Sequence, residues 1–114
     1  MRNKKTHSTT VKKRLDKCKN IFKAYSEILL RYGESLDIRS DIVEIKANYE
    51  LKDFQLGDNY STDFLCIKDN GELMVRECVL KKNLMKPGTI KLLDCSLNYW
   101  RSKGVKDWGV VLDG

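Results

Sequence analysis

Apolar positions in the first third of the chain predict one helix after a polar arm. Residues up to about position 10 are almost all polar. From there to Tyr32 the apolar side chains fall at positions 21, 25, 28, 29 and 32, which is the spacing of one helical face. Gly33 and the polar residues that follow are expected to end this helix.

Alternating and continuous apolar runs predict three strands in the middle of the chain. Residues 42–51 alternate between apolar and polar from position 44 onward, which is typical of a strand. Residues 52–62 contain a cluster of Gly, Asp and Asn and are expected to form a loop. The runs 63–68 and 72–80 flank Asp69-Asn70-Gly71, which predicts a hairpin. Both runs are apolar on both faces, so we expect them to lie centrally in a covered sheet.

The last third of the chain predicts a second helix and a final strand. Residues 86–88 form a break, and Thr89 is the expected N-cap of a helix that ends at Gly104. One face of that helix carries the apolar stripe Leu93, Leu97 and Trp100. Residues 108–112 then form a short apolar run. The order α-β-β-β-α-β predicts an α/β fold with a mixed central sheet flanked by helices.

The composition indicates one globular domain. The chain has 114 residues, of which 41% are hydrophobic and 33% charged. We divide it into a basic arm, residues 1–14, and a single domain, residues 15–114. No apolar run approaches the roughly 18 residues of a membrane span, and no apolar segment follows the basic start as in a secretory signal. We therefore expect a cytoplasmic protein without a membrane partner.

The four cysteines indicate neither a zinc site nor a disulfide framework. They have no CxxC spacing, and the single histidine, His7, lies in the polar arm. A zinc site needs four clustered ligands, and disulfides are rare in cytoplasmic proteins. We therefore expect reduced and mostly buried cysteines.

Positive charge is concentrated at the amino terminus. Residues 1–24 contain nine Lys and Arg residues and one acid, whereas the remainder has 13 basic and 15 acidic residues. A basic arm beside a nearly neutral body predicts a grip on the phosphate backbone of DNA, with a solubilising tail as the alternative. The candidate DNA-binding residues are Arg2, Lys4, Lys5, Lys12, Lys13, Arg14, Lys17 and Lys19.

Two acidic residues, Asp63 and Glu77, lie in the predicted hairpin, and the register of the hairpin decides whether they meet. A loop of three residues, 69–71, places Leu65 opposite Val75 and Asp63 opposite Glu77. Both carboxylates then lie on one face with Cβ atoms about 5 Å apart. A two-residue loop would send them to opposite faces. We expect the first register.

Opposed carboxylates repel unless one is protonated or a cation bridges them. Oxygen ligands at this spacing suit Mg²⁺ or Mn²⁺, which can activate water and stabilise a phosphoryl transition state. In the structural alternative Asp63 caps its strand and Glu77 pairs with a Lys or Arg. Glu27 likewise has two interpretations: a ladder of salt bridges with Lys23 and Arg31, or a third ligand on a helix over the sheet.

Seven short stretches in this order are similar to those of one nuclease family. They are residues 26–30, 41–46, 61–65, 75–79, 86–93, 99–100 and 108–111. Together they resemble the amino-terminal catalytic domain of TnsA, the endonuclease subunit of heteromeric transposases. That domain belongs to the PD-(D/E)xK, restriction-endonuclease-like superfamily. The resemblance covers roughly residues 20 to 112 and implies a restriction-endonuclease-like core.

The resemblance also implies a metal site. It makes Glu27, Asp63 and Glu77 the metal-binding carboxylates for Mg²⁺ or Mn²⁺, and the carbonyl of Cys78 a further ligand.

The family places its lysine two positions after the second acid, where this chain has Val79. Lys81 on the same strand face, or Lys91 on the following helix, is the candidate replacement. A domain that binds DNA without cutting it is the third possibility.

The leading hypothesis is a Mg²⁺-dependent DNA endonuclease acting in a bacterial or phage-infected cytoplasm. It is either a transposon-end nuclease with a transposase subunit as partner or a stand-alone relative from a phage or mobile element, and relatives often form homodimers. The alternative is a non-catalytic DNA-binding or adaptor module on the same fold, and a third reading is a domain that binds a protein partner. Convergence of Glu27, Asp63 and Glu77 favours the nuclease, whereas dispersed acids with their own partners favour the binding module.

Overall fold

The computed structural model describes residues 2–3, 10–51 and 60–113. Its elements are β1 (Arg2–Asn3), β2 (Val11–Lys13), β3 (Phe22–Ala24), α1 (Glu27–Asp37), β4 (Ile42–Glu50), β5 (Tyr60–Lys68), β6 (Leu73–Val79), α2 (Lys81–Leu84), α3 (Pro87–Ser102) and β7 (Asp107–Leu112). Within these ranges no helix is long and apolar enough to cross a membrane. The loop expected at residues 52–62 lies mostly outside the described ranges, and β5 already begins at Tyr60.

The main sheet is mixed, as the element order predicts. β5 runs antiparallel to both β4 and β6, whereas β7 runs parallel to β6. The short β1 pairs with the beginning of β5. The parallel pairing follows from the connection between β6 and β7, because the intervening α3 carries the chain back across the sheet. The α/β class with a mixed sheet is thus confirmed, and α1, β4, β5, β6, α3 and β7 follow the predicted order, with β1–β3 and α2 in addition.

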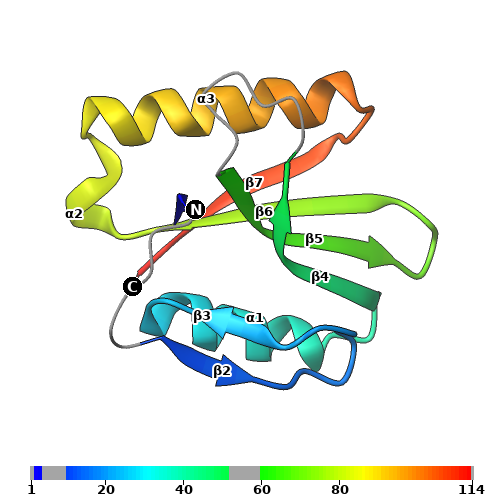
Figure 1. Cartoon of the computed structure of the whole chain (residues 1–114). Coiled ribbons are helices and arrows are strands. Elements are labelled where there is room, and N and C mark those ends of the chain that lie inside the picture. Colours follow the sequence, from blue (N-terminus) through cyan, green and yellow to red (C-terminus); the bar gives the residue numbers. More distant parts are fainter. Residues whose placement is uncertain (1, 4–9, 52–59, 114) are drawn as a thin grey trace.

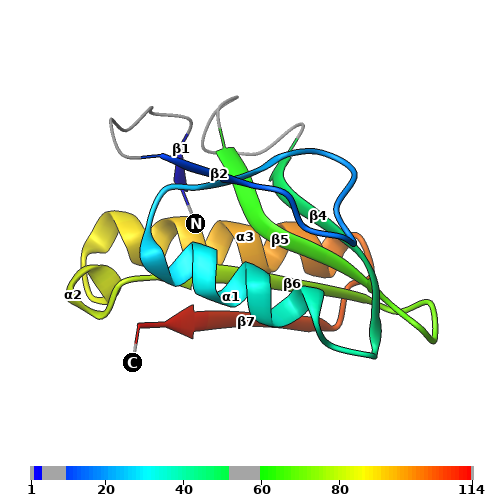
Figure 2. The ribbon, with the colours of Figure 1, turned by 90° about the horizontal axis from the view of Figure 1, so that it is seen from below.

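Helices cover both faces of this sheet, and each face has its own core (Figures 1 and 2). The α1-side core lies under α1 and the small β2–β3 sheet and contains Leu15, Cys18, Phe22, Ala24, Leu29, Leu36, Ile42, Ile45, Phe64, Cys66, Met74 and Cys78. The α3-side core contains Leu51, Tyr60, Leu65, Val75, Trp100 and Val105. The central position expected for β5 and β6 is explained by this double cover.

The register of the β5–β6 hairpin is the one predicted. Leu65 pairs with Val75, and the N–H of Lys68 donates to the carbonyl of Glu72 at 2.9 Å. Residues 69–71 therefore form a three-residue loop. Gly71 has φ +86°, a left-handed conformation that glycine adopts without steric cost.

The prediction of a helix from about residue 11 to Tyr32 is wrong. Val11–Lys13 and Phe22–Ala24 form the antiparallel β2–β3 sheet, and α1 begins only at Glu27. Phe22 and Ala24 are buried while the intervening Lys23 is exposed, which is the alternation of a strand.

The predicted end of this helix at Gly33 is also wrong, because α1 continues to Asp37. Gly33 is buried within the helix, against the ring of Phe22. A Cβ at position 33 would lie 2.6 Å from Cε2 of Phe22, so glycine serves here as a packing residue rather than a helix stop.

The second long helix begins earlier than predicted and presents a different face. Lys86 is the N-cap of α3 and Pro87 its first residue, in place of the expected Thr89. Trp100 is buried as expected, but Leu93 and Leu97 are only half-buried. Packing against the α3-side core comes instead from Leu92, Cys95 and Tyr99, with Ser96 fully buried. The end at Gly104, with φ +85°, agrees with the prediction.

Candidate functional site

Asp63 and Glu77 meet at the point where β5 and β6 separate. The last paired residues of the two strands in this direction are Phe64 and Arg76. Beyond them, the N–H of Asp63 donates to Oε1 of Glu77 at 2.9 Å, and the N–H of Cys78 donates to Oδ2 of Asp63 at 2.8 Å. Each carboxylate therefore takes a backbone N–H of the opposite strand, in place of a ladder bond. Both side chains are buried, with 2% of Asp63 and none of Glu77 exposed.

The normal alternation of β5 breaks at Asp63. Phe64 belongs to the α1-side core, yet Thr62, two residues earlier, bonds to Glu77 and Trp100 in the α3-side layer. The neighbouring strand changes face at the same level: Ala47 packs on the α1-side core, whereas the ring of Tyr49 lies 6.0 Å from that of Trp100. Two residues apart, regular strand positions would share a face.

A left-handed residue on β4 accompanies this change of face. Asn48 has φ +53°, and its side-chain amide exchanges two hydrogen bonds with the backbone of Lys23, at 2.9 and 3.1 Å. Asparagine tolerates this conformation better than most residues. Asn48 thus joins β4 to β3 at the point where the side chains of β4 change from one face of the sheet to the other.

Glu77 is the centre of a buried polar network. Its Oε2 accepts hydrogen bonds from the hydroxyls of Tyr60, at 3.1 Å, Ser96, at 2.6 Å, and Thr62. Two indole N–H groups extend the network. Nε1 of Trp100 donates to the Thr62 hydroxyl at 3.3 Å, and Nε1 of Trp108 donates to the Ser96 hydroxyl at 3.1 Å.

These five partners were not predicted from the sequence. Hydroxyl residues interrupt apolar stretches at Thr62 and Ser96, and the second lies four residues before Trp100 in a helix. That spacing signals a shared helix face, but nothing in it indicates which acid the face meets.

Burial dominates the acid–base behaviour of this network. It raises the pKa of Glu77 above the usual glutamate range, and the hydroxyl donors offset only part of that effect. Burial, followed by the neighbouring Glu77, likewise raises the pKa of Tyr60. A carboxyl with three hydroxyls and one backbone N–H around it is saturated with partners, which is how buried polar groups are stabilised.

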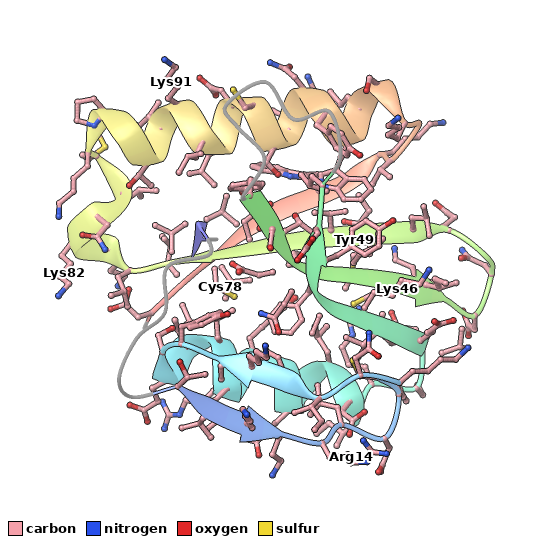
Figure 3. All side chains as sticks on the ribbon, in the orientation of Figure 1. Arg14, Lys46, Tyr49, Cys78, Lys82 and Lys91 are labelled. Carbon is pink, nitrogen blue, oxygen red and sulfur yellow. The ribbon has the colours of Figure 1, made fainter. Side chains whose placement is uncertain are left out.

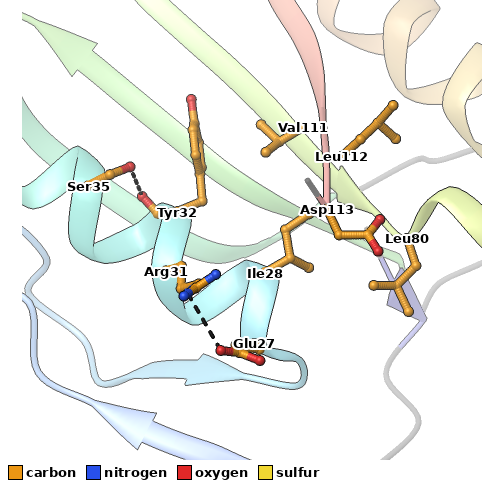
Figure 4. Close-up of a pocket in the computed structure, with 9 residues that line it drawn as sticks. All are labelled: Glu27, Ile28, Arg31, Tyr32, Ser35, Leu80, Val111, Leu112 and Asp113. Carbon is orange, nitrogen blue, oxygen red and sulfur yellow. Dashed lines mark hydrogen bonds and ion pairs between the residues drawn. The ribbon is translucent and has the colours of Figure 1, made fainter.

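This arrangement does not fit the divalent-cation site that the resemblance implies. A cation needs carboxylate oxygens that face a shared, open position, whereas Glu77 has no exposed surface and four hydrogen-bond donors. Glu27 is 79% exposed and pairs with Arg31 at 3.5 Å, which is one of the two ion pairs of the salt-bridge interpretation (Figure 4). Among the described residues, no group of three or more His, Cys, Asp or Glu side chains is arranged to hold a metal ion.

The two lysines proposed for catalysis are exposed, whereas Asp63 and Glu77 are buried. Lys81 is exposed and opens α2, and its N–H donates to Asp113. Lys91 is exposed on α3, and Figure 3 shows it pointing away from the sheet. Cys78 is buried, and burial raises the pKa of its thiol to about 12. Val79 is buried too.

The described part of the basic segment forms an outward surface on β2 and β3. The register pairs Lys12 with Lys23, and both are exposed because Phe22 and Ala24 point into the core. Like charges directly opposite each other in a ladder repel. Arg14 and Lys19 are exposed as well. For these four cations no ion pair with an acid is seen within residues 10–51 and 60–113.

Two other predicted contact residues are already engaged. Lys13 pairs with Glu34 at 3.0 Å, and Nζ of Lys17 donates to the carbonyl of Arg39. Of the remaining candidates, Arg2 lies in β1, and Lys4 and Lys5 lie outside the described residues.

No protein-family model matches this chain, and no curated protein is detectably similar to it in sequence.

Proposed function

We propose that the chain is a nucleic-acid-binding module in which the outward face of β2 and β3 grips the phosphate backbone. The observation that carries this proposal is the cross-strand pair of Lys12 and Lys23. A protein surface that holds two ammonium groups opposite each other stores repulsion. A phosphate between them turns that repulsion into attraction and releases counterions from the nucleic acid.

The surroundings of this pair support the same partner. Arg14 and Lys19 add exposed positive charge on the segment that joins β2 to β3, and the first 24 residues carry nine cations and one acid. Exposed cations without acidic partners are free to bind phosphate, whereas paired ones such as Lys13 are partly neutralised. DNA is the partner expected from the resemblance, and RNA presents the same phosphates.

The buried acids support binding without cutting. The carboxylate oxygens of Glu77 and Asp63 accept hydrogen bonds that join β5, β6 and α3. In this proposal they are structural, and the restriction-endonuclease-like core serves as a scaffold for the basic face.

A Mg²⁺-dependent nuclease is the second candidate, and one observation favours it. The two acids do lie side by side on the two central strands of an α-β-β-β-α-β core, which is the position that the resemblance assigns to metal ligands. A transposase subunit as partner belongs to this candidate alone.

The test of binding is fluorescence anisotropy with short labelled duplex and single-stranded DNA, and with RNA, between about 50 and 200 mM salt. The double variant Lys12→Gln/Lys23→Gln is compared with Lys82→Gln/Lys91→Gln, which removes the same charge from exposed positions far from Arg14 (Figure 3). We expect the first variant to bind more weakly and to flatten the plot of log affinity against log salt by about two units. Equal effects of both variants would show that net charge alone drives binding and would refute this surface.

A DNA cleavage assay decides between the two candidate functions. Plasmid DNA is incubated with Mg²⁺ or Mn²⁺, using the wild type and Asp63→Asn. We expect binding without nicking in both. Nicking that requires the metal and is lost in Asp63→Asn would establish the nuclease instead.

A further inference from the structure

β7 is the open edge of the main sheet. Among the described residues it pairs only with β6, from Met74 opposite Asp107 to Val79 opposite Leu112. Figure 2 shows β7 at the margin of the sheet, with no described segment beyond it. One row of its backbone N–H and C=O groups therefore faces outward, and such a row is a template for a further strand.

The usual protections against pairing are missing from the middle of this edge. Residues 109–111 carry neither charge nor proline, although natural edge strands commonly use both. The side chains of Val110 and Leu112 are 36% and 38% exposed. Charged residues occur only at the ends of the strand, as Asp107 and Asp113.

The two ends of the strand differ in their charged groups. Asp107 is ion-paired with Lys68 at 2.6 Å and with Arg76 at 2.7 Å, so this group of three has one net positive charge. Asp113 at the other end is exposed and its carboxylate accepts the N–H of Lys81. A second copy that runs antiparallel brings Asp113 of each copy to the cations around Asp107 of the other, which a parallel copy does not.

A two-fold axis through Val110 gives the most complementary register. It places Val110 opposite Val110 of the second copy, and Trp108 opposite Leu112 of the second copy. The exposed apolar side chains then cover one another, which is how cross-strand pairs stabilise a sheet. In the same register Asp113 lies opposite the positive group around Asp107 of the second copy.

Apolar surface continues from this edge onto α1. A cavity of about 440 Å³ lies between the end of β7 and α1, and its apolar lining consists of Ile28, Tyr32, Leu80, Val111 and Leu112 (Figure 4). A strand pair of six residues alone is small for a stable interface. This adjoining groove enlarges the surface that a second copy can cover.

We infer that the chain forms a homodimer by antiparallel pairing of β7 with β7 of a second copy. The interface is isologous, so each copy presents the same strand, and the two main sheets become one continuous sheet. This surface is separate from the basic face of β2 and β3, so the dimer is independent of the proposed nucleic-acid binding.

Sedimentation velocity over roughly a hundredfold range of protein concentration tests the dimer. The wild type is expected to sediment at twice the chain mass of 13.3 kDa at the upper end of that range. Val110→Lys places two like charges at the two-fold axis and is expected to raise the dissociation constant by about tenfold or more. Val43→Lys, at an exposed position on β4, is the matched control and is expected to leave the dimer intact.

A cross-link tests the register independently of stability. Directly opposed residues of antiparallel strands have Cα atoms about 4.5 to 5.5 Å apart, which a disulfide can span. In a Cys95→Ser background, Val110→Cys is expected to cross-link under mild oxidation and Val43→Cys is not. A wild type that stays monomeric, or a dimer that Val110→Lys and Val43→Lys affect equally, would overturn the inference. Folding of each variant is checked by circular dichroism.

Discussion

Glu77→Gln is the sharpest test of the buried polar network. The amide keeps the size of the carboxyl but cannot ionise. Its nitrogen faces either the hydroxyls of Tyr60, Thr62 and Ser96, which now donate to Oε2, or the N–H of Asp63, which donates to Oε1. At least one donor therefore loses its acceptor, which costs about 1 to 3 kcal/mol at low pH.

The pH dependence of the difference between wild type and variant carries the stronger prediction. Burial raises the pKa of Glu77 in the folded state, whereas the unfolded chain releases the proton at about pH 4.3. Below that pH the carboxyl is protonated in both states. Between the unfolded and the folded pKa the folded state binds more protons, so the stability of the wild type falls as pH rises.

The size of this effect follows from one proton. Linkage gives a loss of about 1.4 kcal/mol for each pH unit within that window, and none above the folded pKa. The variant has no group there to titrate. The stability of the wild type relative to Glu77→Gln is therefore expected to decline as pH rises from about 4.3 to the folded pKa.

Urea denaturation at a series of pH values, followed by circular dichroism, measures the difference. Glu27→Gln is the matched control, because it removes the carboxylate of an exposed side chain and is expected to change stability by less than about 0.5 kcal/mol. A difference between wild type and Glu77→Gln that stays constant with pH, or that grows in favour of the wild type, would refute this account of the network.

Three further changes test other parts of the fold. Gly33→Ala places a methyl group 2.6 Å from the ring of Phe22 and is expected to cost about 1 to 3 kcal/mol in urea denaturation, although alanine is the better helix former. Asp107→Asn removes two ion pairs of a partly buried group whose pKa they lower, so it is expected to cost up to about 1 kcal/mol at pH 7 and less at pH 3, by the same assay. With a thiol reagent at pH 8, Cys95 is expected to react first, because burial raises the pKa of the Cys66 thiol to about 12; early labelling of Cys66, found by mass spectrometry, would count against the core described above.

Local sequence signals were sufficient for the strands and the hairpin. The alternation of residues 42–51 and the apolar runs on either side of Asp69-Asn70-Gly71 predict β4, β5 and β6 nearly to their observed bounds. The register followed because Gly71 supplies a left-handed turn residue, which is a property of a few adjacent residues. The adjacency of Asp63 and Glu77 was predicted from that register alone.

The helix predicted for the amino-terminal region is wrong because the structure there depends on a distant contact. Strands of three residues have too little alternation to be recognised, and the apolar positions 21, 25, 28 and 29 fit a helical face by coincidence. Only the packing of Phe22 against Gly33 shows why glycine lies inside α1 rather than at its end. The buried face of α3 differs from the predicted face for a similar reason, because Ser96 on that face is hydrogen-bonded to the buried Glu77.

For the candidate site, the sequence by itself determined which two acids become neighbours and where the positive charge gathers. The tertiary structure alone decided what surrounds them. Burial of Glu77 depends on Tyr60 and Ser96, which lie 17 and 19 residues away, and the exposure of Glu27 depends on how α1 lies on the sheet. Hydrogen-bond partners and desolvation are set by packing between elements, and packing has no periodic signature along a single chain.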